Sequence, residues 1–261
     1  MNDLQGTRLQ DVFPSRPLRF FERIESTNDI GLEWLQAGAP DGALVIADAQ
    51  TEGRGRLGRS WYAPPGTALL FTMVYTAPRN LAVRSTMLGA LAVAETLREM
   101  GVRGVGIKYP NDVQIARRKV CGVLAEAAWT DTVGVALGIG VNVRVDFTGT
   151  PFEQTATSLE TVLNRPVDRA SLLQSIVARL DFWRVRLATD ALPAAWHSYL
   201  NMLGEWVEVH TGGEVLRGIA TDVAPDGSLI LRDRHGVLRP VWAGDLITPG
   251  DDRTPDSDVE P

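Results

Sequence analysis

The stretch Gly53-Arg54-Gly55-Arg56-Leu57-Gly58-Arg59-Ser60-Trp61 places three glycines and three arginines within nine residues. Glycine lets the backbone adopt a positive φ and come close to a ligand, and arginine grips carboxylates and phosphates with two parallel donors. Apolar, strand-like runs lie on both sides of the stretch, at 43–48 and 68–75. A loop between two buried strands is well placed to bind a ligand, so we predict an anion-binding loop. Taken alone, the tract also fits a flexible basic loop or a nucleic-acid patch.

The remaining chain alternates further strand-like and helical patterns. Apolar runs typical of strands occur at 18–24, 106–108, 119–126 and 132–142. Helices are expected from about Ser26 to Gly38, over 85–100, after the cap residue Asp168 and over 194–203.

Both ends of the chain and its last third have their own character. Residues 1–17 are polar with two prolines, and we expect a loose arm. From residue 205 short alternating runs separated by turns predict a small β-barrel. Residues 250–261 are acidic with almost no hydrophobic side chain, which predicts a disordered tail.

The composition excludes several classes of protein. The net charge is −6, and residues 250–261 contribute −4 of it through five acids and one arginine, so the remainder is nearly neutral and a dedicated DNA-binding surface is not expected. No apolar run approaches the roughly 18 residues that a membrane span needs, and no signal peptide is recognisable. The single cysteine, Cys121, excludes a disulfide within the chain and indicates a reducing, cytoplasmic setting.

Two motifs combine a lysine with features of a binding site. Lys108-Tyr-Pro-Asn-Asp112 is typical of a turn that follows a short strand, although many such turns are hairpins and nothing more. Lys119 opens the next strand, and Gly122 within that strand indicates that another group approaches the backbone. The glycines in the run 132–142 carry the same implication.

The stretch Ser26-Thr27-Asn28 has two interpretations. Ser26 or Thr27 is a good helix N-cap, and the residues then serve only the helix. Alternatively, their spare hydroxyl and amide groups bind a polar ligand at the helix N-terminus.

Together, these motifs resemble those of the biotin protein ligase family. The matching segments fall in the family's order and near its spacing, and the resemblance spans about residues 18–248: Ser26-Thr27-Asn28, Gln50, 53–59, 108–112, 119–122 and 138–142. Two departures are visible. Tyr109 stands where the family usually has tryptophan, and Leu57 interrupts what is often a basic run.

The resemblance implies a fold and a reaction. The fold is α+β, with a mixed sheet flanked by helices in a biotin/ATP-binding domain at 18–203, followed by an SH3-like barrel at 204–249. The reaction joins biotin and ATP, with Mg²⁺, into biotinyl-5′-AMP and transfers biotin to one lysine of a biotin carboxyl carrier protein. The short stretch before residue 18 resembles the ligase-only class, without a DNA-binding module, and we expect a monomer or homodimer that binds neither nucleic acid nor membrane.

The resemblance also implies roles for individual residues. Lys119, Arg54, Arg56, Lys108 and Asp112 are the expected catalytic residues, and Asp112 either holds Mg²⁺ or orients a lysine. Biotin is expected to contact Ser26, Thr27, Asn28, Gln50, Arg54, Gly55, Arg56, Lys119 and Gly122. ATP or the adenylate is expected to contact Arg56, Arg59, Trp61, Lys108, Asn111, Lys119 and Asn142.

Three other functions compete with this prediction. Lipoate ligases and octanoyl transferases share the catalytic fold, and a catalytic cysteine would mark the transferase. A biotin-responsive repressor would need a basic helix-turn-helix segment. An RNA-binding module would need a basic face studded with aromatic side chains.

Overall fold

The computed structural model describes residues 3–4, 6–129, 133–211, 213–224, 226–242 and 244–248. The chain divides into two compact units, one formed by residues 1–145 with 157–201 and the other by residues 146–156 with 202 onwards. Residues 146–156, which sequence analysis assigned to the catalytic domain, thus group with the second unit. The predicted disordered tail, 250–261, lies outside the described residues.

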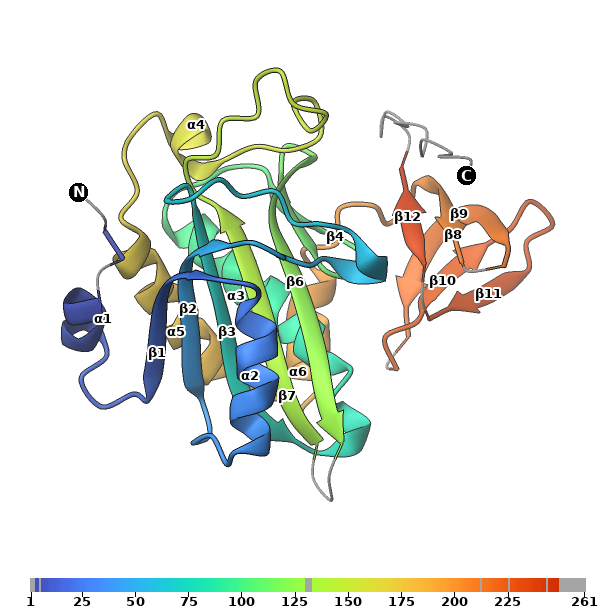
Figure 1. Ribbon diagram of the computed structural model, residues 1–261. Helices are drawn as coiled ribbons and strands as arrows, with labels where there is room; N and C mark the ends of the chain where they lie inside the picture. Colours follow the sequence, from blue (N-terminus) through green and yellow to red (C-terminus); the bar gives the residue numbers. More distant parts are fainter. Residues whose placement is uncertain are drawn as a thin grey trace, which may run out of the picture. The chain divides into compact units, whose positions relative to one another are not determined.

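A seven-stranded mixed sheet forms the centre of the first unit (Figure 1). Its strand order is β1-β2-β3-β7-β6-β5-β4, in which β1 and β2 are parallel and the other neighbours are antiparallel. The strands are β1 Leu18–Ile24, β2 Ala43–Gln50, β3 Ala68–Ala77, β4 Val105–Lys108, β5 Asp112–Ile115, β6 Arg118–Trp129 and β7 Val133–Asn142. The α+β class and the mixed sheet are therefore confirmed.

Helices cover both faces of this sheet (Figure 1). One face carries α2 (Thr27–Gln36), whose Gly31 lies against Thr72 and Ala136. The other face carries α3 (Arg84–Glu99), whose Gly89 lies against Val123 and Leu137. The helix α5 (Arg169–Arg184) packs beside α3, and Asp168 caps it as predicted by accepting a hydrogen bond from the Ser171 amide at 2.8 Å. The short elements are η1 Arg56–Gly58, η2 Arg79–Leu81 and α4 Leu159–Leu163.

The N-terminal segment is not the loose arm expected from its polar sequence. Residues Gly6–Val12 form the helix α1, and Leu4 and Leu9 are fully buried. Asp3 accepts hydrogen bonds from Arg169 at 2.7 Å and from Arg144 at 2.9 Å. The prediction was wrong because it weighed composition alone, whereas two leucines and one ion-pair network dock this segment.

The helix expected over residues 194–203 also has other limits in the structure. The helix α6 spans Ala191–His197 rather than 194–203, since Pro193 fits within a first helical turn. The chain then leaves the helix and pairs with the edge strand β4, where the Ile107 amide donates to the Tyr199 carbonyl at 2.7 Å and the Asn201 amide donates to the Ile107 carbonyl at 3.1 Å. Residues 199–201 therefore pair with the edge of β4 instead of continuing the helix.

The second unit contains the predicted set of short strands. They form a five-stranded antiparallel sheet in the order β11-β10-β9-β8-β12, and Val209, Ala220 and Leu231 lie in its core. The strands are β8 Trp206–His210, β9 Val215–Val223, β10 Leu229–Arg232, β11 Leu238–Val241 and β12 Asp245–Ile247. Among the helices of the described segments, none has the length and apolarity needed to cross a membrane.

Candidate active site

The face of the sheet that carries α2 has a surface without side chains on β6 and β7. Gly122 on β6 faces Gly140 on β7, and Gly138 lies two residues further along β7. A Cβ atom at Gly140 would lie 2.8 Å from the Trp61 indole, and one at Gly138 would lie 2.3 Å from Asn28 Oδ1. The close backbone approach expected at these glycines is therefore confirmed.

The first turn of α2 forms a buried polar cluster with the neighbouring strands, against this surface. Asn28 donates to Glu126 Oε2 at 2.6 Å and accepts from the Thr72 hydroxyl at 2.6 Å. Gln50 accepts from the Thr27 backbone amide at 2.6 Å, and Thr27, Asn28 and Thr72 are all buried. Both amide protons of Asn28 are used, since the second points to the Leu124 carbonyl at 3.3 Å. The orientation of the Asn28 amide is thereby fixed.

Ser26 occupies the N-cap position of α2, as predicted, but its hydroxyl makes no capping hydrogen bond. The residue is nevertheless buried. The helix cap therefore does not use the Ser26 hydroxyl, and the contact of residues 26–28 with a ligand stays a prediction.

The glycine/arginine loop closes on itself at its base. The Trp61 amide donates to the Gly53 carbonyl at 2.8 Å, and the Gly55 amide donates to the Arg59 carbonyl at 2.7 Å. Arg54 and Ser60 form an isolated antiparallel bridge between these bonds. The loop thus has a defined neck, and its tip at Leu57 and Gly58 adopts positive φ angles of 56° and 75°.

Arg54, in the neck, faces two carboxylates. It donates to both oxygens of Asp29, at 2.7 and 2.5 Å, and lies 3.6 Å from Glu126. Hydrogen bonding to Asp29 raises the pKa of Arg54 above its already high value. The Arg54 guanidinium thus contacts two carboxylates of the protein itself, and its expected contact with a ligand carboxylate stays a prediction.

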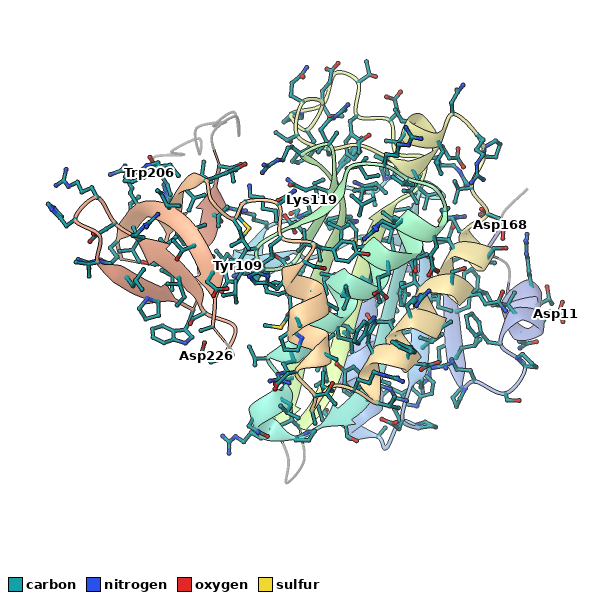
Figure 2. The ribbon with its side chains drawn as sticks, turned by 180° about the vertical axis from the view of Figure 1, so that it is seen from behind. Asp11, Tyr109, Lys119, Asp168, Trp206 and Asp226 are labelled. Carbon is teal, nitrogen blue, oxygen red and sulfur yellow. The ribbon has the colours of Figure 1, made fainter. Side chains whose placement is uncertain are left out.

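Lys119 and Arg56 lie beside the β4–β5 turn. Lys119 Nζ forms an ion pair with Asp112 Oδ1 at 2.8 Å, and Arg56 donates to Asn111 Oδ1 at 3.2 Å. Asp112 is opposite Lys108 across the β4–β5 hairpin. Residues that sequence analysis took from three separate motifs are thus neighbours; Figure 2 labels Lys119 and Tyr109 in this unit.

Trp61 covers the glycine surface at the same place. Lys119 Nζ lies 5.4 Å from the centre of a Trp61 ring, and the indole lies against Gly122 and Gly140. The indole Nε1 is buried without a hydrogen-bond partner among the described residues. Because a buried unpaired donor is costly, this N–H is a candidate partner for a ligand.

Asn142 and Cys121 have structural roles in the strands β7 and β6. The Asn142 amide donates to the Lys119 carbonyl at 3.4 Å and the Thr157 carbonyl at 3.2 Å, so it ties the ends of β6 and β7 to the following loop. The expected contact of Asn142 with the adenine stays a prediction. Cys121 is fully buried, and burial raises the pKa of its thiol, which makes it a poor nucleophile.

The residues present fit a Mg²⁺ ion only in part. In the segments that the structure describes, no group of three or more His, Cys, Asp or Glu side chains is arranged to hold a metal. Asp112 is the carboxylate beside the cations, and Lys119 already contacts one of its oxygens. Such a site suits a Mg²⁺ that keeps water and nucleotide phosphates as most of its ligands.

Sequence analysis missed three residues of this site. Asp29, Glu126 and Thr72 contact Arg54 or Asn28 directly. Asp29 follows Asn28 immediately and was visible as a first-turn acid, but Thr72 and Glu126 lie in strands whose periodicity carries no sign of a binding role.

Comparison with known proteins agrees with this geometry. Residues 20–142 match the model of the biotin/lipoate A/B protein ligase family, and residues 202–247 match that of the biotin protein ligase C terminal domain. A biotin–[acetyl-CoA-carboxylase] ligase of Mycobacterium tuberculosis is 33% identical, with 89% of each chain covered. The bifunctional ligase/repressor BirA of Bacillus subtilis is 30% identical over 88% of this chain and 73% of its own length. A biotin protein ligase from Aquifex aeolicus, solved in complex with biotin and ATP, superimposes with a TM-score of 0.77 at 25% identity over 89% of this chain and 99% of its own.

The fold and the site define a protein ligase of the biotin/lipoate class, with a mixed sheet, a glycine-lined surface and a cation cluster beside it. The family matches in both units and the identity to two biotin–[acetyl-CoA-carboxylase] ligases then narrow the class. The chain belongs to the biotin protein ligase family.

Proposed function

We propose that this protein activates biotin with ATP to form biotinyl-5′-AMP and transfers the biotinyl group to a lysine of a biotin carboxyl carrier protein. The observation that carries the proposal is one surface with two neighbouring parts. Asn28 belongs to a polar cluster at Gly138, while Trp61 lies against Gly140 and Gly122 and Lys119 lies beside Gly122. Two residues along an antiparallel strand span about 7 Å, so a ligand with a polar head and a carboxylate end fits both parts at once.

The first step brings two anions together, which requires positive charge. A biotin carboxylate oxygen attacks the α-phosphorus of ATP, and the bond from that phosphorus to the oxygen bridging to the β-phosphate breaks, releasing pyrophosphate. Arg56 and Lys119 are assigned to the carboxylate and the α-phosphate, and Arg59 and Lys108 to the remaining phosphates. A bound Mg²⁺ would neutralise phosphate charge, with Asp112 as its one carboxylate in this cluster.

In the second step, the ε-amine of a carrier lysine attacks the acyl carbonyl of the adenylate. The bond from the acyl carbon to the phosphate oxygen breaks, the amine loses a proton, and AMP leaves. No protein nucleophile is needed, in keeping with the fully buried Cys121. The Trp61 indole N–H and the side-chain oxygen Oδ1 of Asn142 lack hydrogen-bond partners in the described segments and are offered to the adenylate.

The proposal also covers the compartment, the carrier protein and the oligomeric state. A single buried cysteine suits the reducing cytoplasm, and the carrier is the biotin-accepting domain of a carboxylase. We expect the enzyme to act as a monomer or homodimer.

Pyrophosphate exchange into ATP tests the proposal. We expect exchange that depends on biotin and is absent with lipoate or octanoate in its place. Exchange that responds to lipoate or octanoate and not to biotin would assign the site to the other acids of the class.

A further inference from the structure

The arginines of the loop 53–61 have different surroundings. Arg54 contacts two carboxylates, those of Asp29 and Glu126. Arg56, two residues further, contacts the neutral amide of Asn111. The alternating sequence gives no sign of this division.

Charge argues against a ligand carboxylate at Arg54. One guanidinium faces two carboxylates, so this cluster carries a net charge of −1 and repels a further anion. The Asp29 contact is bidentate, the geometry that uses the arginine fork most fully. A ligand carboxylate would have to displace it.

The position of Arg54 in the loop indicates what its contacts with Asp29 and Glu126 hold in place. Arg54 lies in the neck, opposite Ser60 and between the hydrogen bonds that join Gly53 to Trp61 and Gly55 to Arg59. Asp29 belongs to the first turn of α2, and Glu126 belongs to β6. The guanidinium therefore ties the neck of a glycine-rich loop to two rigid elements.

Glu126 connects this anchor to the polar cluster around Asn28. The same carboxylate that lies near Arg54 accepts from the Asn28 amide at 2.6 Å. The neck of the loop and the orientation of Asn28 thus share one partner.

We propose that Asp29 and Glu126 make Arg54 a positioning residue, which fixes the neck of the loop and so places Trp61 over the glycine surface and Arg56 beside Asn111. The consequence for ligand binding rests on the proposed function, but the anchor itself does not. Biotin binding is then a task of Arg56 and Lys119, and Arg54 contributes through the loop.

Limited trypsin digestion tests the anchor without any reference to activity, because Arg56 and Arg59 are themselves cleavage sites within the loop. Asp29→Asn keeps the shape of the side chain and removes its charge. We expect cleavage at Arg56 and Arg59, followed by mass spectrometry, to become about fivefold faster, which corresponds to about 1 kcal/mol, the upper value for a half-exposed ion pair. Glu33→Gln, an exposed acid on the same helix, is the matched control and should leave the rate unchanged.

Two further variants make the result specific to the pair. Asp29→Glu should restore most of the protection, and combining Asp29→Asn with Arg54→Ala should add little to either change alone. Unchanged cleavage in Asp29→Asn, or full additivity in the double variant, would overturn the anchor.

Biotin affinity, measured by calorimetry, distinguishes a positioning role of Arg54 from direct binding of the biotin carboxylate, because Asp29→Asn changes the affinity in opposite directions in the two cases. If Arg54 acts through the loop, Asp29→Asn weakens biotin binding several-fold, because part of the binding free energy must then order the loop. If Arg54 binds the carboxylate, the same substitution frees its guanidinium and tightens binding, which would overturn the proposal. Wild-type protein that binds no biotin would instead contradict the proposed function, and the digestion result would still decide the anchor.

Discussion

At the scale of single residues, the site depends on the absence of Cβ atoms. Asn28 has both amide protons and one acceptor position engaged, so it has no freedom to turn away from Gly138. Trp61 lies equally close to Gly122 and Gly140. Methyl groups at these positions would have to displace the side chains that form the ligand surface.

Gly138→Ala should therefore weaken biotin binding strongly while the fold is retained. The added Cβ would lie 2.3 Å from Asn28 Oδ1, which forces Asn28 out of its hydrogen bonds to Thr72 and Glu126. We expect at least a tenfold loss of affinity, of the order that loss of one buried hydrogen bond causes, measured by calorimetry. Gly213→Ala, where nothing lies within 4 Å of the new methyl group, is the control. Undiminished biotin affinity in Gly138→Ala would show that Asn28 does not contact biotin.

Cys121 should be chemically silent in the folded protein. Burial raises the pKa of its thiol, so the thiolate that reacts is scarce at pH 8, and the sulfur is also inaccessible. We expect a thiol reagent to label the native protein far more slowly than the same protein in denaturant. Since the chain has one cysteine, the reading is unambiguous, and rapid stoichiometric labelling of the native protein would contradict the buried position.

Part of this site could be predicted from the sequence because some of its charged residues stand in recognisable local motifs. Lys108, Asp112 and Lys119 stood in motifs with turn and glycine signals, and the structure brings them together. Asp29 and Glu126 did not stand out because exposed acids on helices and strands are common. Their partner was a guanidinium distant in sequence, a pairing that only the three-dimensional fold defines.

At the scale of elements, a buried ion network joins the N-terminal segment to the sheet and to α5. Arg169 is 1% exposed and contacts Asp3 at 2.7 Å and Asp48 at 2.8 Å. Arg8 on α1 also pairs with the α5 cap residue Asp168 at 2.8 Å; Figure 2 labels Asp168 at the start of α5 and Asp11 on α1. The segment before β1 is therefore part of the folded unit.

Asp3→Asn should destabilise the protein because it leaves Arg169 buried with one carboxylate fewer. We expect a loss of about 3 kcal/mol in the free energy of unfolding, the low end for breaking a buried pair, since Asp48 remains. Denaturant titration measures it, and Asp11→Asn, on the exposed side of α1, is the matched control. A difference below about 0.5 kcal/mol would mean that the segment is not docked in solution.

The contacts of Asp3 with Arg144 and Arg169 predict how the free energy of unfolding changes with pH. Burial by itself raises the pKa of Asp3, but hydrogen bonds from Arg144 and Arg169 lower it well below its usual range. A lowered pKa means that the stabilisation is complete above about pH 4, the ordinary pKa of aspartate, and is lost as the pH falls below that value. The stability gap between wild type and Asp3→Asn should therefore be constant from pH 5 to 8 and narrow in acid.

The elements that sequence predicted best were those with strong periodicity. The strands β1, β2, β3, β4, β6 and β7 and the helices α3 and α5 lie where their apolar patterns place them, whereas the short strand β5 (Asp112–Ile115) was not predicted. The helices α1 and α6 were missed or misplaced because their limits depend on distant partners: Arg169 for the first, and the edge of β4 for the second. Local sequence does not contain that information.

At the scale of the whole molecule, the charge is small and locally concentrated. The net charge is −6, and residues outside the acidic stretch 250–261 contribute only −2. Binding to duplex DNA draws on many lysine and arginine contacts to phosphate. The cations of the site are instead gathered beside the β4–β5 turn, where they suit a nucleotide.

We therefore expect no specific binding to duplex DNA at physiological salt, with or without biotin, although some relatives are ligase/repressors. Fluorescence anisotropy over a salt series measures it. A nanomolar, sequence-specific complex would restore the repressor as a second function of this chain.

The rates of the two half-reactions in Lys119→Ala test the chemistry of the site most directly. Lys119, held by Asp112 at 2.8 Å, is assigned to the charge that develops as the carboxylate attacks the α-phosphorus. Stabilisation of this kind contributes on the order of 10²–10³ in rate, and it is needed mainly in adenylation. We predict that biotin-dependent pyrophosphate exchange slows by that factor, while single-turnover transfer from supplied biotinyl-5′-AMP to the carrier slows far less. Equal slowing of both half-reactions, or slowing of neither, would contradict the assignment of Lys119 to the adenylation step.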